Sequence, residues 1–210
     1  LNYIKLLKND VFAFKIGYEF FFNFGLDGYK IVKKENIKIF LDLKLNDIPN
    51  TVKQGIEAIA KLEPFFTTIH ISGGDEMQKK AIAASYKTKI LGVSILTSID
   101  SNQSKKYFYN SNVKKIVSDY AKNAYYNKID GIVCSPLEIE LVRKVTQKNF
   151  IIVTPGIRPE NYKSDNDDQK RFVTPKQAIN SGANFVVIGR PITKSKYPLK
   201  TVQEINNSII

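Results

Sequence analysis

The feature that most constrains the fold is the regular alternation of short apolar runs with longer segments of helical periodicity. Seven runs of strand length are rich in β-branched and aromatic residues: 11–16, 37–43, 67–71, 89–96, 131–134, 150–154 and 185–188. Segments with helical patterns lie between them, at 18–34, 52–62, 75–85, 113–127, 136–146 and 175–181. Uninterrupted alternation of this kind predicts parallel βαβ units, with helices covering the strands.

The number of units favours a (β/α)8 TIM barrel, although only seven strands are visible. Leu1, Ile4 and Leu7 have helical spacing, so the chain begins within what reads as the helix after a first strand. We therefore expect that the first strand of the barrel is missing from this sequence. An open seven-stranded α/β sheet is the competing interpretation. Since no linker-like or low-complexity stretch interrupts the pattern, residues 1–210 are expected to form a single barrel domain.

Composition excludes several classes of protein. The formal charge of +12 raises the question of nucleic acid, but the 32 basic residues comprise 28 lysines and only 4 arginines, scattered along the chain. Arginine makes most contacts with base edges, so we attribute the charge to compositional drift and expect no nucleic-acid partner. No run of eighteen apolar residues predicts a membrane span. A single cysteine, Cys134, excludes a disulfide framework and fits a cytoplasmic protein.

The strongest chemical signal lies at the end of the apolar run 37–43. Asp42 and Lys44 are two residues apart, so on a strand they share a face, with Cα atoms roughly 6–7 Å apart. In a barrel the carboxyl ends of the strands carry the active site. Asp47 follows in the next loop, and flanking carboxylates would keep Lys44 protonated, making it a proton donor rather than a nucleophile. A surface salt bridge is the alternative interpretation of this pair.

Lys15 provides a second charge at a strand end. It shares its face with the small residues Ala13 and Gly17, which leave room for a ligand. A lysine that merely extends to solvent from a strand end is equally compatible with this pattern.

Two arginines follow the last two strands. Arg158 comes after a glycine turn, and Arg190 comes directly after Gly189. The last two loops of a barrel frequently form a phosphate site, in which glycine admits backbone N–H groups and arginine offers a bidentate fork. The polar segment 159–171 between the two has the length and position of a mobile lid.

Other familiar sites are not predicted. His70 is the only histidine, so a multi-histidine metal site is excluded and a structural role is expected. The sequence also contains no nucleophile elbow, Walker loop or dinucleotide-binding fingerprint.

Together these pieces resemble the orotidine 5′-phosphate decarboxylase family over nearly the whole chain. The motifs that carry the resemblance are Phe14-Lys15-Ile16-Gly17, Phe40-Leu41-Asp42-Leu43-Lys44, Asp47-Ile48-Pro49-Asn50-Thr51, His70 with Ser72-Gly73-Gly74, Leu96-Thr97-Ser98, Thr154 to Pro159, and Ile188-Gly189-Arg190-Pro191. The Asp-x-Lys-x-x-Asp pattern is shared with sugar-phosphate decarboxylases of the same barrel lineage. The Ile-Pro-Asn-Thr and Thr-Pro-Gly-Ile-Arg-Pro motifs are more specific.

The resemblance implies conversion of orotidine 5′-phosphate to uridine 5′-phosphate and CO2, the last step of de novo pyrimidine biosynthesis, without metal or cofactor. It assigns the proton donor to Lys44, the neighbourhood of the substrate carboxylate to Asp42, and the ribose to Lys15. It also implies a homodimer with shared active sites. The remaining implied contacts are Asp47 and Thr51 to the partner subunit's site, Thr97 (with Ser98) to the pyrimidine, and Gln169, Gly189, Arg190 and the adjacent Arg158 to the phosphate.

One departure from the family pattern concerns its first strand, which ends in a binding Asp. No counterpart precedes Lys15, since Asp10 lies after the first helical segment. A truncated sequence explains this more simply than a lost ribose contact. A sugar-phosphate decarboxylase or aldolase, and a basic non-catalytic binding protein, are the alternative functions.

Overall fold

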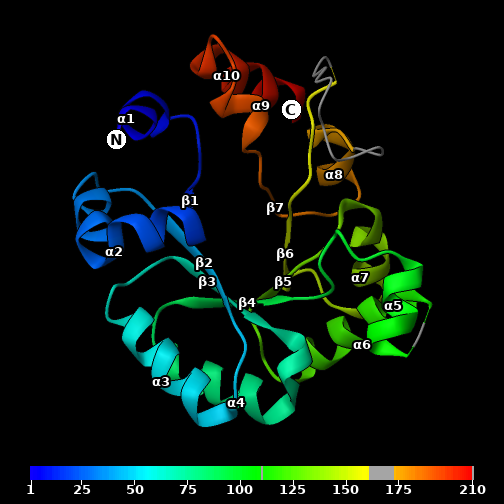
Figure 1. The fold of residues 1–210 in the computed structure, drawn as a ribbon. Coiled ribbons are helices and arrows are strands. Elements are labelled where there is room, and N and C mark those ends of the chain that lie inside the picture. Colours follow the sequence, from blue (N-terminus) through cyan, green and yellow to red (C-terminus); the bar gives the residue numbers. More distant parts are fainter. Residues whose placement is uncertain (110, 161–172, 210) are drawn as a thin grey trace. The chain divides into compact units, whose positions relative to one another are not determined.

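The structure is a computed structural model that describes residues 1–109, 111–160 and 173–209 (Figure 1). The chain divides into two compact units, Leu1–Leu91 and Gly92–Ile210, which are described in turn. Both units consist of parallel strands joined by helices, as the alternation in the sequence predicts.

The first unit carries the front half of the alternating pattern. Its elements are α1 (Asn2–Leu7), β1 (Phe14–Ile16), α2 (Tyr18–Lys33), β2 (Ile39–Leu45), α3 (Pro49–Ala60), β3 (Phe66–His70), the 3-10 turn η1 (Ile71–Gly73), α4 (Gly74–Ala84) and the start of β4 (Lys89–Val93). Strand β1 pairs with β2, with Phe14 opposite Ile39, and β2 pairs with β3, with Phe40 opposite Phe66. The register between β2 and β3 shifts between Leu41 and Leu45. This irregularity falls on the segment that carries Lys44.

Burial of one face of each element forms the core of this unit. Ile16 of β1 and Leu41 of β2 are buried against Tyr29 and Val32 of α2, together with Ile4 of α1. Helix α2 is interrupted at Gly25, whose φ of 55° lies in the left-handed region that glycine tolerates best. Helices α3 and α4 pack against each other (Figure 1).

The second unit contains three further strands. Its elements are α5 (Ser101–Phe108), α6 (Val113–Tyr126), β5 (Gly131–Val133), the 3-10 turn η2 (Pro136–Glu138), α7 (Ile139–Val145), β6 (Ile151–Thr154), α8 (Pro175–Asn180), β7 (Phe185–Val186), α9 (Arg190–Thr193) and α10 (Pro198–Ile209). Strands β5, β6 and β7 pair in parallel in chain order. A Cβ at Gly131 would lie 2.3 Å from the Ile151 carbonyl oxygen, so only glycine fits at this point of the β5–β6 pair.

Two further side chains of the second unit are the partly buried Arg143 and the buried Cys134. Arg143 donates to four acceptors, the carbonyls of Gly182 (2.8 Å), Gln147 (3.2 Å) and Phe150 (2.6 Å) and the side chain of Asn184 (2.5 Å). These bonds tie α7 to the segments that enter β6 and β7. Cys134, directly after β5, is 2% exposed, and burial raises the pKa of its thiol.

The positions of the seven strands are confirmed within a few residues, but three helices, α5, α9 and α10, were not predicted. Helix α9 has only four residues, too few to show a period. Helix α5 buries only Ser104 among its eight residues, and α10 buries only Val202 and Ile205. The sequence of α5 has few apolar residues, whereas Leu199, Val202 and Ile205 of α10 have helical spacing and could have revealed that helix. The helix predicted at 136–146 begins as the 3-10 turn η2 and continues as α7. No helix in the described parts of the chain combines the length and apolar character needed to cross a membrane.

Candidate active site

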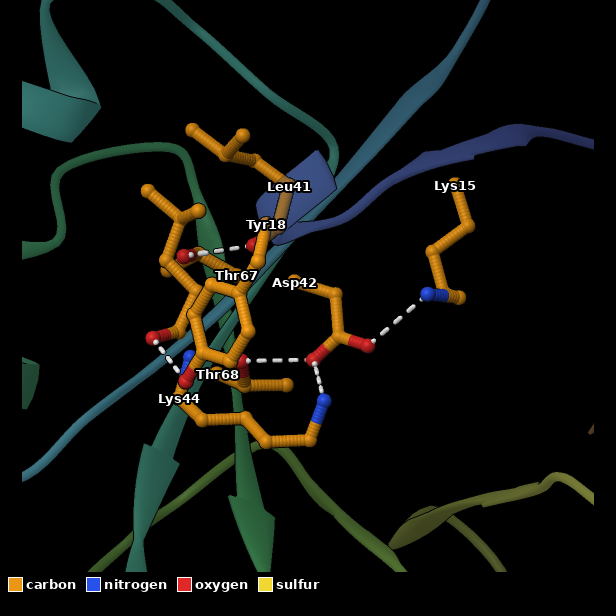
Figure 2. Close-up of polar contacts among 8 residues, drawn as sticks. Lys15, Tyr18, Leu41, Asp42, Lys44, Thr67 and Thr68 are labelled. Carbon is orange, nitrogen blue, oxygen red and sulfur yellow. Dashed lines mark hydrogen bonds and ion pairs between the residues drawn. The ribbon is translucent and has the colours of Figure 1, made fainter. Parts of the chain in front are cut away.

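Asp42 is the centre of a charged cluster at the carboxyl ends of β1 and β2 (Figure 2). Its Oδ1 lies 2.8 Å from Nζ of Lys44, and its Oδ2 lies 3.1 Å from Nζ of Lys15. Asp42 itself is 7% exposed, whereas the side chains of the two lysines remain partly open, at 37% for Lys15 and 26% for Lys44. The structure therefore brings together three of the predicted site residues, with the carboxylate buried and the two lysines partly exposed.

Parallel pairing explains why these three side chains meet. Lys15 stands opposite Phe40 in the β1–β2 register, which places it beside the end of β2 where Asp42 and Lys44 follow. Gly17, after β1, lies beside the end of the Lys15 side chain, and a Cβ there would be in ordinary van der Waals contact with the Lys15 Nζ at 3.4 Å. Room for a ligand beside Lys15 stays a prediction from the sequence.

The backbone at Lys44 departs from regular strand geometry. Its φ of 46° is left-handed, an uncommon conformation for a residue with a side chain. Its N–H donates to Oγ1 of Thr68 on β3 at 2.8 Å, and the Thr68 hydroxyl donates to Oδ1 of Asp42 at 3.0 Å. Thr68 thus connects both charged residues, although nothing in the sequence distinguished it from its neighbour Thr67.

The electrostatics of the cluster keep Asp42 ionised. Burial of the Asp42 carboxyl raises its pKa, but the charges and hydrogen bonds of Lys15 and Lys44 outweigh this effect and hold the pKa below its ordinary value of 3.8. At neutral pH the cluster therefore contains one carboxylate between two ammonium groups, with a net charge of +1. Such a site suits an anionic substrate.

His70, at the end of β3, is half-buried near the same cluster. Burial lowers its pKa below 6.5, and the nearby Lys44 ammonium lowers it further. The imidazole is therefore neutral at pH 7 and contributes no charge to the site.

Tyr18 is a second neighbour of Lys44 that the sequence did not identify. Its hydroxyl donates to the Leu43 carbonyl at 3.1 Å, and its ring centroid lies 5.8 Å from the Lys44 Nζ (Figure 2). This distance is near the outer limit of a cation–π contact. The ring is therefore a near neighbour of the Lys44 ammonium group.

Asp47 and Thr51 lie apart from this cluster. Both are exposed, and Oδ1 of Asp47 accepts the N–H of Ile48 at 2.6 Å. Among the described residues of one chain, Lys44 forms its ion pair with Asp42 and none with Asp47. The described part of the chain therefore shows no second carboxylate of the same subunit beside Lys44. Their exposure leaves both side chains available to another molecule.

The remaining predicted residues belong to the second unit. Arg158 is 5% exposed and follows β6, where its Nη1 donates to the Ile157 carbonyl at 3.0 Å. Gly189 and Arg190 are exposed at the start of α9, and no atom would obstruct a Cβ at Gly189 within 4 Å. Gln169 and most of the predicted lid lie outside the described residues.

Thr97 is exposed in the wall of a cavity of about 700 Å³ within the second unit. Lys114, Ser135 and Glu138 also line this cavity. The Glu138 carboxylate accepts the Ser135 N–H at 3.1 Å in a capping box, and burial raises the pKa of Glu138 to about 7 despite that hydrogen bond. Glu138 carried no functional signal in the sequence because its role at the turn is local.

In chemical terms, the cluster of the first unit offers an ammonium proton donor beside a carboxylate. No group of three or more His, Cys, Asp or Glu side chains within the described residues could hold a metal ion. An ammonium held by a neighbouring carboxylate, as Lys44 is by Asp42, can deliver a proton to a bound anion.

Comparisons with known proteins show which family the chain is similar to. The chain is 45% identical over 205 residues to the orotidine 5′-phosphate decarboxylase of Wolbachia pipientis subsp. Culex pipiens, covering 97% of this chain and 89% of that protein. It is 43% identical over 208 residues to the corresponding protein of Ehrlichia chaffeensis, covering 98% of this chain and 89% of that one.

A solved structure shows the same fold. The crystal structure of orotidine 5′-phosphate decarboxylase from Lactobacillus acidophilus matches with a TM-score of 0.79 at 36% identity, covering 93% of this chain and 85% of that one. This likeness confirms the predicted fold class, the α/β barrel. The model of the orotidine 5′-phosphate decarboxylase / HUMPS family matches residues 1–205. With its lysines and aspartate assembled as the motifs predict and with relatives of this similarity over nearly its whole length, the chain belongs to the orotidine 5′-phosphate decarboxylase / HUMPS family.

Proposed function

We propose that this protein converts orotidine 5′-phosphate to uridine 5′-phosphate and CO2, with Lys44 as the proton donor. As a member of its family it is a carboxy-lyase. The observation that carries the assignment of roles is the position of the buried Asp42 carboxylate, 2.8 Å from the Lys44 ammonium and 3.1 Å from that of Lys15.

The chemistry requires a cation beside the reacting carbon. Breaking the bond between C6 of the pyrimidine and the carboxylate releases CO2 and leaves the electron pair on C6, where no adjacent group delocalises it. The Lys44 ammonium stabilises this developing charge and transfers its proton to C6, and water then reprotonates the amine. A charged donor held in place before the reaction stabilises the transition state without reorganisation.

Asp42 has two roles in this scheme. It orients Lys44 through their 2.8 Å contact, and, because its pKa is lowered, it remains a carboxylate at neutral pH. Placed near the substrate carboxylate, that charge repels the group that leaves as CO2. Lys15 offsets the repulsion enough for the substrate to bind and donates to the ribose.

Further contacts with the substrate are proposed for residues outside the charged cluster. Arg190 and the backbone of Gly189 bind the phosphate together with Gln169, and Arg158 lies at the base of the same loop. Thr97 contacts the pyrimidine. The exposure of Arg190 and Thr97 fits roles in binding a ligand from solvent. A phosphate bound away from the reacting carbon supplies binding energy that can be used at that carbon.

The proposed assembly is a homodimer with shared active sites in the cytoplasm, acting in pyrimidine biosynthesis. Asp47 and Thr51 are exposed on the loop and helix that follow β2. Each would reach the site of the partner subunit, where Asp47 would complete the charged cluster. A twofold axis makes this exchange reciprocal.

The reaction as proposed needs no metal and no cofactor. This distinguishes it from the sugar-phosphate decarboxylases and aldolases of the same barrel lineage, which need a divalent metal. If turnover of orotidine 5′-phosphate survives an excess of chelator, the decarboxylase is supported. If the chelator abolishes turnover and added magnesium restores it, the metal-dependent class is supported.

The direct test follows the ultraviolet absorbance of orotidine 5′-phosphate as it is converted to uridine 5′-phosphate by the purified chain. We expect absorbance to fall with wild-type protein and to remain constant with Lys44→Ala. Lys53→Ala, at an exposed lysine of α3 paired with Glu57, is the matched control and should retain wild-type turnover. No conversion by the wild-type protein would overturn the proposal.

A further inference from the structure

We propose that Thr68 is the positioning residue of the decarboxylation, because its hydroxyl sets the backbone of Lys44 and the carboxylate of Asp42 in the geometry of the reaction. This inference rests on the proposed function. It adds a residue outside the charged cluster to the machinery that orients the proton donor.

The first observation is a closed set of contacts. The Lys44 N–H donates to Oγ1 of Thr68 at 2.8 Å, and that hydroxyl donates to Oδ1 of Asp42 at 3.0 Å. The same Oδ1 accepts from the Lys44 Nζ at 2.8 Å. Thr68 therefore contacts both ends of the Lys44–Asp42 pair, one through the backbone and the other through the carboxylate (Figure 2).

The direction of these bonds is fixed by chemistry. A hydroxyl has one proton to donate and two lone pairs to accept with. The backbone N–H of Lys44 can only donate, and the ionised Asp42 can only accept, so Thr68 must donate to Asp42 and accept from Lys44. Valine would fill the same volume but could provide neither bond.

The second observation explains why a side chain is needed here. The β2–β3 register shifts between Leu41 and Leu45, and Lys44 has a left-handed φ of 46°. In this conformation its N–H bonds to the threonine side chain. Thr68 is fully buried, so water cannot take its place at that N–H.

Thr67, the preceding residue of β3, provides a matched comparison. It is also fully buried, and its hydroxyl donates to the Leu41 carbonyl at 2.9 Å. The two threonines thus each bond to β2, but Thr67 reaches only a backbone carbonyl before the register shift. Loss of either hydroxyl should cost similar stability, whereas only that of Thr68 should affect the reaction.

The experiment compares Thr68→Val with Thr67→Val. We expect Thr68→Val to lower kcat by about ten- to hundredfold, because small misplacements of reacting groups have effects of this size. KM should change less than twofold, since the hydroxyl is buried behind the cluster. Thr67→Val should keep kcat within twofold of wild type, although its melting temperature should fall by about as much as that of Thr68→Val. Thr68→Ser, which retains the hydroxyl, should recover most of the turnover.

Two outcomes would overturn the inference. One is a kcat of Thr68→Val equal to that of Thr67→Val, and the other is a Thr68→Ser protein as slow as Thr68→Val. Should the valine protein fail to fold, Thr68→Cys replaces it, because a thiol is a weak donor and acceptor of similar size.

A second measurement separates this inference from the proposed function. Amine acylation followed by peptide mass spectrometry gives the modification rate of Lys44 relative to Lys38 without any substrate. We expect the ratio to rise severalfold in Thr68→Val and to stay unchanged in Thr67→Val. An unchanged ratio in both proteins counts against positioning by Thr68, whereas a wild-type chain without decarboxylase activity counts against the proposed function alone.

Discussion

The Lys44 ammonium and the Asp42 carboxylate meet at 2.8 Å although the backbone between them leaves the regular strand at Lys44. Two residues on one strand face share a direction, but their side chains do not ordinarily touch so closely unless both are held. Here the register shift of β2 and the hydroxyl of Thr68 hold them. The contact between Lys44 and Asp42 therefore depends on β3 as well as on β2.

Lys44→Ala is expected to abolish turnover while the fold remains intact. Removing the ammonium removes both the charge that stabilises the carbanion and the proton that quenches it. Steady-state turnover and far-ultraviolet circular dichroism measure the two effects separately. More than about a tenth of wild-type turnover, equivalent to a loss of less than 1.4 kcal/mol, would refute Lys44 as proton donor.

Asp42→Asn is expected to lower the free energy of unfolding at pH 7 by about 2 kcal/mol. This loss is smaller than that for breaking a fully buried ion pair, because both lysines are partly exposed. The pKa of Asp42 is lowered in the folded state, so its contribution to stability is present above about pH 4 and is lost as the pH falls further. Urea unfolding of both proteins should therefore show a difference at pH 7 that shrinks at pH 3.

The control for this measurement is Asp27→Asn, since the Asp27 side chain is 93% exposed and lies 3.7 Å from Lys30. It should change stability little at either pH. A difference between wild type and Asp42→Asn that is constant from pH 7 to pH 3 would contradict the assignment of Asp42 as the ionised centre.

Arg190→Ala is expected to weaken binding of the phosphorylated substrate far more than it alters the chemistry. A guanidinium binds phosphate through two parallel hydrogen bonds, which orotidine without phosphate cannot use. Comparing kcat/KM for the two substrates isolates the phosphate contribution. Lys194→Ala, at the other end of α9, is the control and should affect neither. Equal losses for both substrates in Arg190→Ala would exclude a phosphate role.

Glu138→Gln is expected to remove a pH dependence of stability. Burial raises the pKa of Glu138 from 4.5 to about 7 in the folded state, so the neutral acid is favoured. Its contribution to stability is complete below pH 4.5 and is lost as the pH rises through about 7, by at most about 3 kcal/mol. Glutamine keeps an oxygen for the Ser135 N–H. The difference in unfolding free energy between the two proteins should change in favour of Glu138→Gln from pH 5 to pH 8, and no change would contradict the raised pKa.

Mixing Lys44→Ala with Asp47→Ala is expected to restore activity if the active sites are shared between subunits. Random exchange makes about half of the dimers mixed, each with one intact site of two, so about a quarter of wild-type activity should return. Mass labelling verifies the exchange, and each variant alone must be nearly inactive. Activity that stays at the level of the separate variants after complete exchange would place Asp47 outside the partner's site.

The sequence was sufficient for the fold class and for the Asp42–Lys44 pair because both follow from local periodicity. Contacts across strands were harder to predict. Thr68 and Thr67 are adjacent and chemically identical, and their different roles depend on which residues of β2 each one faces across the irregular β2–β3 register. The orientation of Asp47 toward the Ile48 N–H depends on loop geometry, which periodicity does not describe.

Cys134 allows local opening of the second unit to be measured by thiol labelling. It is the only thiol of the chain, it is 2% exposed directly after β5, and its raised pKa disfavours the reactive thiolate. A thiol reagent can therefore reach it only when this part of the molecule opens. The rate of its labelling in the wild-type chain records how often β5 separates from its surroundings, and a ligand that binds the folded state should slow that rate in proportion to its occupancy.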